Sequence, residues 1–521
     1  MSIELDTPAT TTPDQPSPKL RFVDLEIVKP QPDALALAPG DFALKHQVLP
    51  LSIDKGVLVV AIGSPDSLPA VDDLGVLLDR PLRSVLAQPH LIREQIEEQF
   101  IEKMLAGLPQ DEGAYAEIDE NADLADLQQM AGTTAVIQMV NLIFSQAVRD
   151  NASDIHIEPY EREVRVRYRL DGILHEMIRP PKRMHAALIS RIKILGEMNI
   201  AERRLAQDGR IKLQISGRQV DVRVSIVPTI YGERAVMRIL DKSNTVYGLQ
   251  EVGMAMDVLE VYRKLIRQPH GMILSTGPTG SGKSTTLYGS LQELTSPTTN
   301  ILTIEDPVEY QIAGIGQIQV RPAIGLTFAG GLRNLVRQDP DILMVGEIRD
   351  QETAEIAIHA ALTGHMVFST LHTNDSAGAV TRLLDMGVEP YLAASSIIGV
   401  VAQRLVRRNC PHCSQPYHES EAVFKSLSLD PSLASKPLMK GQGCEKCQGT
   451  GFKGRTGLFE LLVVDESIQS LITAHATASA IKSYAVETLK MRTLLEDGGR
   501  TMMAGLTTPE EVLRVCQREE L

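Results

Sequence analysis

A glycine-rich segment, GPTGSGKS at residues 277–284, has the residue types that bind the phosphates of ATP. Its glycines can turn backbone N–H groups toward phosphate oxygens, Lys283 supplies a positive charge, and the Ser284 hydroxyl suits Mg²⁺. An apolar run precedes the segment and a helical pattern follows it, so phosphate would lie at a helix N-terminus. A glycine-rich loop can arise by chance, but these flanks favour a nucleotide site. The expected nucleotide contacts are Gly277, Pro278, Thr279, Gly280, Ser281, Gly282, Lys283, Ser284 and Thr285.

Two further apolar runs end in carboxylates. NILTIEDPVEY ends in Glu305 and Asp306, and DPDILMVGEIRD ends in Glu347, with Gly346 where such strands commonly carry Asp. Because the carboxyl ends of parallel strands meet at one edge, these groups would lie beside the phosphates. We expect Glu347 to order Mg²⁺ and its waters, and either Glu305 or Glu347 to polarise the attacking water. The alternative for Glu305 and Asp306 is capping of a turn before Pro307.

A fourth apolar run lies in GHMVFSTLHTND, between His365 and His372. His372 would fall at the same edge as the phosphate loop and is a candidate to sense the γ-phosphate. The alternative is a structural histidine.

Several arginines could complete the site from a neighbouring subunit. Arg333 and Arg337 are four residues apart and are predicted to share a helix face, while Arg223 and Arg238 lie on predicted strands. An arginine that stabilises transition-state charge contributes ~10³–10⁵ in rate. If these arginines reach a neighbour's nucleotide, the enzyme is a ring. The alternative for each is a surface salt bridge.

Four of the five cysteines form two CxxC pairs, Cys410 with Cys413 and Cys444 with Cys447. Four thiolates suit tetrahedral Zn²⁺ and leave no open position for a substrate, which predicts a structural zinc site. The intervening stretch is long enough to contain a loop or helix. A redox pair is the alternative, and Cys516 is expected to be a packing residue.

The composition limits the possible functions. The chain has 521 residues, which suggests three or four domains, and a net charge of −14 that opposes general nucleic-acid binding. Sparse cysteines indicate a reducing compartment. We find no signal peptide and no apolar stretch of about 18 residues, so we expect a cytoplasmic protein recruited to the inner membrane through a partner.

Pattern changes predict an α/β protein with the following organisation. Residues 1–20 are expected to be a disordered tail. Residues 21–108 form a small α/β domain with a strand at Gly56–Ile62 and a helical stretch starting at Pro89. Residues 109–130 are acidic, as in a solvated linker. Residues 131–245 combine a helix with alternating strands. Residues 246–521 alternate strands and helices, as in a parallel sheet, and include the cysteine insert at about 405–455 and a helical C-terminal region.

These motifs together resemble the bacterial secretion ATPases of the type II secretion and type IV pilus class. Beside the phosphate loop, the acidic strand ends, the histidine segment and the cysteine pairs, the matching elements are ASDIHIEPYE, RLAQDGR and GRTGLFELL. Their order is that of the family. Within the class, the chain is most similar to the E-protein family of type II secretion.

The resemblance implies a homo-hexamer in which each subunit pairs a PAS-like second domain with a RecA-like motor domain. It also implies that Arg223, Arg238, Arg333, Arg337 and Arg455 approach ATP, some of them from a neighbouring subunit. The implied partners are the cytoplasmic domain of the inner-membrane L protein, which would dock on residues 21–108, and the inner-membrane platform protein F. We recognise no cyclic-di-GMP motif in residues 21–45 and do not predict that ligand.

Three alternatives to a type II secretion motor remain at this point. A pilus extension motor has the same chemistry and a different partner. A DNA translocase is opposed by the acidic charge. A nucleotide-gated scaffold without turnover is opposed by the set of Lys283, Ser284, Glu305 and Glu347.

Overall fold

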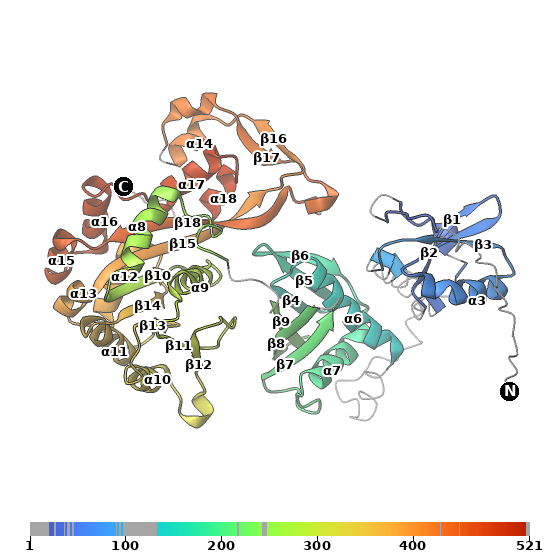
Figure 1. Cartoon of the computed structure of the whole chain (residues 1–521), viewed down its shortest axis with the longest axis horizontal. Coiled ribbons are helices and arrows are strands. Elements are labelled where there is room, and N and C mark those ends of the chain that lie inside the picture. The colour runs from blue at the N-terminus through green and yellow to red at the C-terminus, as the bar shows by residue number, and fades with distance from the viewer. Residues whose placement is uncertain are drawn as a thin grey trace, which may run out of the picture. The chain divides into compact units, whose positions relative to one another are not determined.

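The computed structural model describes residues 20–96 and 133–516, except 26–27, 36, 39–41, 44–45, 90, 93–94, 216–217, 242–246, 428 and 448. The chain separates into two compact units (Figure 1). Unit 1 comprises Met1–Tyr168 and Glu176–Ile239, and unit 2 comprises Arg169–His175 and Leu240–Leu521. The predicted tail up to residue 19, the acidic linker and the helical stretch beyond residue 96 lie outside the described residues.

A three-stranded sheet forms the N-terminal part of unit 1. Strands β1 (Val48–Asp54) and β2 (Val57–Ile62) are antiparallel, and β3 (Leu82–Leu86) runs parallel to β2. Lys55 and Gly56 both have positive φ, as a tight hairpin requires, so the predicted strand begins at Val57 rather than at Gly56. The short α1 (Pro32–Leu35), the 3₁₀ turn η1 (Pro65–Ser67) and α3 (Leu68–Leu78) complete this part.

A second sheet carries the alternating strands predicted for residues 131–245. Its order is β6 (Ile173–Ile178), β5 (Val164–Leu170), β4 (Asp154–Pro159), β9 (Gly232–Asp241), β8 (Arg218–Thr229) and β7 (Gln207–Ile215). Helices α6 (Thr134–Arg149) and α7 (His185–Leu195) and the turn η2 (Lys182–Met184) accompany it. Val164, Val166 and Tyr168 are buried while the residues between them are partly exposed, as a half-buried strand requires.

A seven-stranded sheet organises unit 2. Its order is β12 (Gly316–Gln319), β11 (Ile301–Glu305), β13 (Ile342–Val345), β14 (Met366–Leu371), β10 (Gly271–Thr276), β15 (Ile397–Asn409) and β18 (Phe452–Val463). The four apolar strands predicted from sequence are all present, and they pair in parallel. Strand β18 pairs antiparallel with β15, which the repeated strand–helix pattern did not predict.

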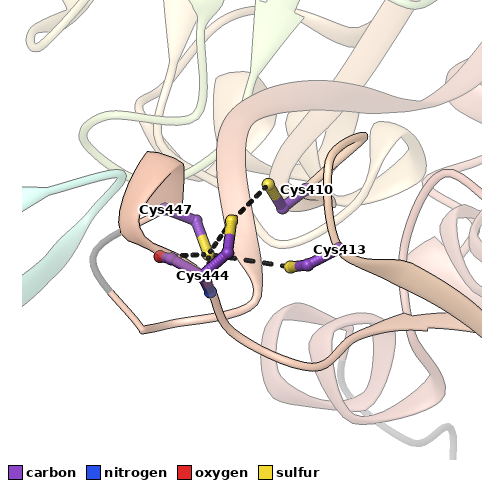
Figure 2. A group of neighbouring side chains, drawn as sticks. All are labelled: Cys410, Cys413, Cys444 and Cys447. Carbon is purple, nitrogen blue, oxygen red and sulfur yellow. Dashed lines mark hydrogen bonds between the residues drawn. The ribbon is translucent and has the colours of Figure 1, made fainter. Parts of the chain in front are cut away.

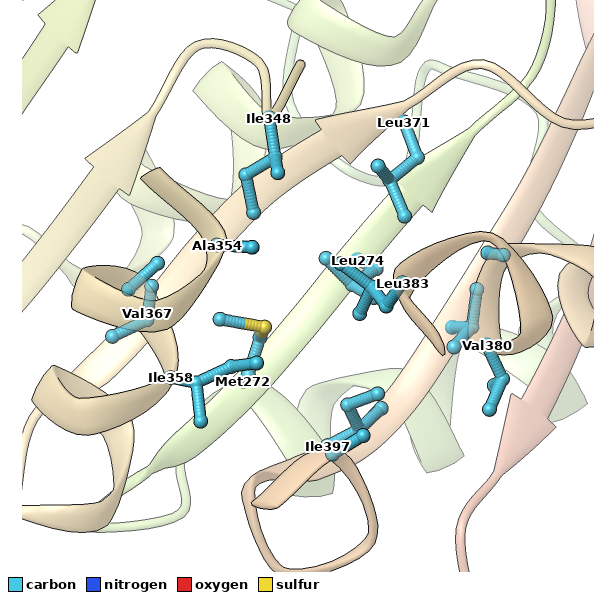
Figure 3. Close-up of a cluster of buried hydrophobic side chains, with 14 of the residues drawn as sticks. Met272, Leu274, Ile348, Ala354, Ile358, Val367, Leu371, Val380, Leu383 and Ile397 are labelled. Carbon is cyan, nitrogen blue, oxygen red and sulfur yellow. The ribbon is translucent and has the colours of Figure 1, made fainter. Parts of the chain in front are cut away.

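Helices cover both faces of this sheet because its strands are apolar on both sides. Met272 and Leu274 point into one core with α11 (Gln351–Leu362) and α12 (Ser376–Asp385) (Figure 3). Ile273, between them, belongs to the opposite core with α8 (Met256–Ile266) and α9 (Lys283–Leu294). Leu287 and Leu291, on the helix after the phosphate loop, are buried in this second core. The remaining elements on this part of the sheet are η3 (Pro322–Ile324), α10 (Phe328–Leu335) and α13 (Pro390–Ser396).

The segment between the cysteine pairs has structure of its own. It contains β16 (Ser414–Tyr417), α14 (Glu421–Ser426), η4 (Pro431–Ser435) and β17 (Leu438–Gly441), and the short η5 (Glu445–Cys447) holds the last cysteine. The helices α15 (Glu466–Thr473), α16 (Ala478–Glu487), α17 (Leu494–Met503) and α18 (Pro509–Val515) follow. Within the described ranges, no helix has the length and apolar character needed to cross a membrane.

Candidate nucleotide and metal sites

The parallel register brings the predicted groups to one edge of the sheet. Thr276 pairs with Leu371, Val345 pairs with Ser369, and Ile304 pairs with Val345, so these strands end together. In the order of the strands, the edge carries Glu305, Glu347, His372 and then the phosphate loop. We call this set the nucleotide edge.

The phosphate loop joins β10 to α9 through glycines in the left-handed region of the backbone. Gly277, Gly280 and Gly282 all have positive φ, which residues with a Cβ adopt only with strain. The buried Ser281 hydroxyl has no hydrogen-bond partner among the described residues, although buried polar atoms are nearly always paired. An unsatisfied hydroxyl in a loop of this shape fits an anionic ligand such as a polyphosphate.

Lys283, at the start of α9, is buried at the same place. Its Nζ donates to the carbonyl oxygens of Gly277, 2.8 Å away, and Pro278, 3.1 Å away. Burial lowers the pKa of Lys283 to about 8, against the opposing effect of Glu347. The ammonium group is therefore held by two weak acceptors that a phosphate could replace.

Glu347 and His372 lie next to each other on this edge. The Glu347 carboxylate is 3.6 Å from His372 Nε2 and 2.7 Å from Arg349 Nη2. Its side chain keeps 14% of its surface exposed, so a water molecule can reach it. Burial and the neighbouring Lys283 lower the pKa of His372, which keeps the imidazole neutral near pH 7.

The second histidine of the predicted pair lies elsewhere. His365 precedes β14 and therefore lies at the amino end of a strand whose carboxyl end leads to His372. Its Nδ1 is 2.8 Å from the carbonyl oxygen of Ala360 at the end of α11. A strand of six residues therefore separates the two histidines by about 20 Å, and only His372 lies at the nucleotide edge.

Glu305 is at the predicted edge but is enclosed by donors. The Tyr288 hydroxyl donates to one carboxylate oxygen, and Thr303 Oγ1 (2.5 Å) and Gln317 Nε2 (3.1 Å) donate to the other. Only 4% of the residue is exposed. This carboxylate ties α9 to β11 and β12, which differs from the turn-capping role considered from sequence.

Two of the predicted arginines, Arg333 and Arg337, contact neighbouring residues of unit 2. Arg333 forms an ion pair with Glu352, and Arg337 donates to Asn334. Helix α10 ends at Leu335, so Arg337 lies beyond the helix and, contrary to the prediction, does not share a helix face with Arg333. The chain then turns toward Asp339, which precedes Pro340 and has a positive φ.

The other three arginines lie on strands. Arg238, on β9, is 3.0 Å from Asp154 on β4. Arg223 lies on β8 and Arg455 on β18.

A polar pair on β15, Gln403 and Arg404, belongs to the nucleotide edge and was missed from sequence. Thr286 Oγ1, in the first turn of α9, donates to Gln403 Oε1 at 2.9 Å. A Cβ on Gly282 would lie 2.6 Å from Gln403 Nε2, so the phosphate loop packs directly on this side chain. The available signal was a Gln-Arg pair inside the apolar run IIGVVAQRLV.

The four cysteines of the CxxC pairs converge (Figure 2). Their sulfur atoms all lie within 4.8 Å of one another, with 3.9 Å between Cys410 and Cys444 and 3.8 Å between Cys413 and Cys447. Four thiolates about 2.3 Å from a central zinc ion have sulfurs about 3.8 Å apart, so this spacing fits a tetrahedral metal site. We call these residues the cysteine cluster.

Backbone groups support the thiolate form of Cys447, whereas burial and the neighbouring thiols raise the pKa of Cys413 to about 11. Burial works to raise the pKa of Cys447, but N–H groups of Cys444 (3.2 Å) and Gly451 (3.3 Å) point at its sulfur and lower the pKa to about 6. A thiolate is the form that binds metal. Cys516 is buried in a separate apolar core, which agrees with its predicted packing role.

Comparison with known proteins identifies the family. A family model described as type II/IV secretion system protein matches residues 129–514, and a model described as MshEN domain matches residues 19–103. The chain belongs to the type II/IV secretion system protein family, and it is an ATPase of this family.

Relatives of both branches match nearly the whole chain. The type II secretion system protein E of Dickeya dadantii is 43% identical, covering 94% of this chain and 98% of its own length. The type IV pilus assembly ATPase PilB of Myxococcus xanthus is 42% identical, covering 95% and 88%. The type II secretion protein HxcR of Pseudomonas aeruginosa is 52% identical over 77% of this chain and 81% of its own.

The same fold occurs in a solved structure. The X-ray structure of the ATPase DotB of Legionella pneumophila matches with a TM-score of 0.53 at 22% identity, over 72% of this chain and 95% of that one. This match supports the α/β architecture with a parallel sheet that was predicted from sequence.

Proposed function

We propose that the chain is the motor ATPase of a type II secretion system, hydrolysing ATP at the nucleotide edge. The observation that carries this proposal is the convergence of the phosphate loop, Glu347 and His372 on one edge of a parallel sheet. Groups of these types supply the positioning and charge stabilisation on which phosphoryl transfer depends.

Lys283 would bind the β- and γ-phosphates. Its ammonium group would donate to phosphate oxygens instead of the carbonyl oxygens of Gly277 and Pro278. The negative charge of the phosphate would favour the protonated form of Lys283. The amides of residues 277–285 would surround the phosphates, with Ser281 donating its unpaired hydroxyl. Ser284 would hold Mg²⁺, which supplies charge neutralisation between the phosphates when bound.

Glu347 is the better candidate for polarising water. It is reachable from solvent and next to His372, whereas both oxygens of Glu305 already accept hydrogen bonds from protein groups. A carboxylate that polarises water needs an acceptor atom that water can approach. We assign Glu305 to fixing α9, and His372 to contact with the γ-phosphate.

The arginines would act between subunits of a hexameric ring. Arg333 and Arg337 are on the surface and lack a contact with the phosphate loop within the described part of their own chain. A guanidinium supplied by a neighbouring subunit could then stabilise the charge that develops on the transferred phosphoryl group. The same role is proposed for Arg223, Arg238 and Arg455.

The cysteine cluster would hold a structural Zn²⁺ through Cys410, Cys413, Cys444 and Cys447. The sulfur spacing and the backbone donors at Cys447 support this assignment. A bound zinc ion would crosslink two segments separated by the β16–β17 insert.

In the cell, the ring would work at the inner membrane from its cytoplasmic side and drive pseudopilus assembly. We propose that residues 21–108 dock on the cytoplasmic domain of the L protein, and that platform protein F receives the motion. The pilus extension role is the alternative, supported by the M. xanthus relative that matches along 95% of this chain.

Three measurements test this proposal with the full-length protein. ATP turnover by the purified chain should stop in Lys283→Ala, and export in a strain lacking the motor should be restored by wild type and not by this variant. A pull-down with the full chain should recover the L protein rather than a pilus platform. Restored piliation without restored export would favour the alternative, and absence of phosphate release with Mg²⁺ and partner would contradict the ATPase.

A further inference from the structure

Arg404, on β15, is a buried arginine whose donors reach backbone carbonyls rather than a carboxylate. Its Nη2 donates to the carbonyl oxygen of Asn374 at 2.7 Å, its Nη1 to that of Gln403 at 3.1 Å and its Nε to that of Val515 at 3.3 Å. Only 7% of the residue is exposed. Among the described residues, no carboxylate forms an ion pair with it.

The register of β15 explains why Arg404 lies behind the phosphate loop. Thr276, the last residue of β10, pairs with Ala402, so the next two residues of β15 run alongside the loop. A Cβ on Gly277 would lie 2.5 Å from the Gln403 carbonyl oxygen and 3.1 Å from Arg404 Nη1. The guanidinium therefore lies against the backbone of the loop at Gly277.

Asn374, whose carbonyl oxygen accepts the shortest hydrogen bond from Arg404, belongs to the same segment as His372. We call residues 372–375 the histidine turn. The hydroxyls of Thr276 and Thr373 are 2.6 Å apart, and the Thr373 N–H donates to Thr276 Oγ1 at 2.9 Å. Arg404 adds a second attachment at Asn374, so the histidine turn is tied to β10 and to β15 on either side of the phosphate loop.

Other charged groups surround this position. Asp375, at the end of the histidine turn, pairs with Lys482 of α16 at 3.2 Å, and Lys482 is 3.6 Å from Glu460 of β18. Burial lowers the pKa of Arg404, against the opposing effect of Cys516, Glu460 and Asp375. A guanidinium keeps its positive charge despite this lowered pKa. The two cations, Arg404 and Lys482, therefore balance the two carboxylates, Asp375 and Glu460.

We propose that Arg404 is a positioning residue that holds His372 at a set distance from the phosphate loop, through its hydrogen bond to the Asn374 carbonyl. This proposal rests on the proposed ATPase function and adds a residue to its site. Arg404 itself does not touch the nucleotide. The planar guanidinium suits the role because it reaches three separate carbonyls in fixed directions, which a lysine cannot do.

The test is a double-mutant cycle on kcat with full-length enzyme. Arg404→Met should lower kcat by ~10²-fold, since displacement of about 1 Å at a reacting group can have that effect, while KM for ATP changes by less than about threefold. In an enzyme already carrying His372→Ala, adding Arg404→Met should lower kcat little further, because both changes act on the same group. Arg404→Lys, which keeps one donor and the charge, should restore part of the rate.

The matched control is Arg407→Met, three residues further along the same strand. Arg407 is also largely buried, but it pairs with Glu511 of α18 at 2.8 Å and does not contact the histidine turn. This variant should lower the melting temperature and leave kcat within about twofold of wild type. Melting temperatures of both methionine variants show whether each is folded, and if Arg404→Met does not fold, Arg404→Lys takes its place in the cycle.

Three results would overturn the positioning role of Arg404. They are a wild-type kcat in the folded Arg404→Met variant, a wild-type kcat in His372→Ala, and a double variant whose loss of kcat is the product of the two single losses. A loss of ATP affinity that equals the loss of kcat would show that Arg404 supports the phosphate loop alone. Failure of the proposed function is separate from these, because wild-type enzyme would then release no phosphate at all.

Discussion

The nucleotide edge and the cysteine cluster of unit 2 both bring reactive side chains together, but from very different lengths of chain. The cysteine cluster takes four thiols from two CxxC pairs. The nucleotide edge takes its groups from five strands between residues 271 and 409, and each group arrives only because the parallel strands end in register.

The difference lies in what holds each site. In the cysteine cluster the side chains are arranged around the place of one ion, so the ligand itself would supply much of the order. In the nucleotide edge the order comes from protein contacts, such as the three donors on Glu305 and the carbonyls around Arg404. Loss of one group should therefore act locally in the first site and through neighbours in the second.

The largest expected effect is at the cysteine cluster. Cys410→Ser with Cys413→Ser should release zinc and remove binding free energy on the order of 10 kcal/mol from the folding of residues 405–455. Elemental analysis and limited proteolysis measure the two effects. Cys516→Ser, which alters a buried cysteine outside the cluster, should keep its zinc. Unchanged metal content in the double variant would contradict the zinc assignment.

The next effect is at the phosphate loop. Lys283→Ala should lower ATP turnover by at least ~10³-fold, because the charge on the β- and γ-phosphates is lost, while zinc content stays as in wild type. Steady-state phosphate release and elemental analysis on the same sample measure both. If the variant lost zinc as well, the two sites would not be independent.

The two carboxylates of the nucleotide edge should respond differently. Glu347→Gln should lower kcat by ~10²–10³-fold while ATP still binds, because the water loses its acceptor. Glu305→Gln should instead lower the melting temperature, with a smaller effect on kcat, because it weakens the network that holds α9. Single-turnover kinetics and thermal unfolding separate the two results. A larger loss of kcat in Glu305→Gln would reverse our assignment.

The smallest effect is in the pH dependence of ATP binding. Burial lowers the pKa of Lys283 to about 8, so the ligand-free enzyme loses this charge as the pH rises through 8. KM for ATP should therefore rise by about fivefold between pH 8 and pH 9, whereas it should be nearly flat between pH 6.5 and pH 7.5. Lys283→Arg binds ATP with a charge that does not titrate in this range, and its KM should show no such rise.

Much of this architecture could be predicted from the sequence because its signals are local. The phosphate loop has fixed spacing, the CxxC pairs share one chemistry, and the apolar strands stand out from the helices between them. Arg404 was missed because its role comes from β15, a strand distant in sequence from the loop that it supports.

The length of β15 has a mechanical consequence. This strand has thirteen residues, about 43 Å when extended, and it runs from its pairing with β10, past Gln403 and Arg404, to Asn409, with a shift of register near each end. Cys410 follows directly, about 20 Å from Arg404 along the chain. Between Gln403 and Asn409 the strand pairs with β18, so a pull on the cysteine cluster along β15 would be carried by an extended strand to the back of the phosphate loop.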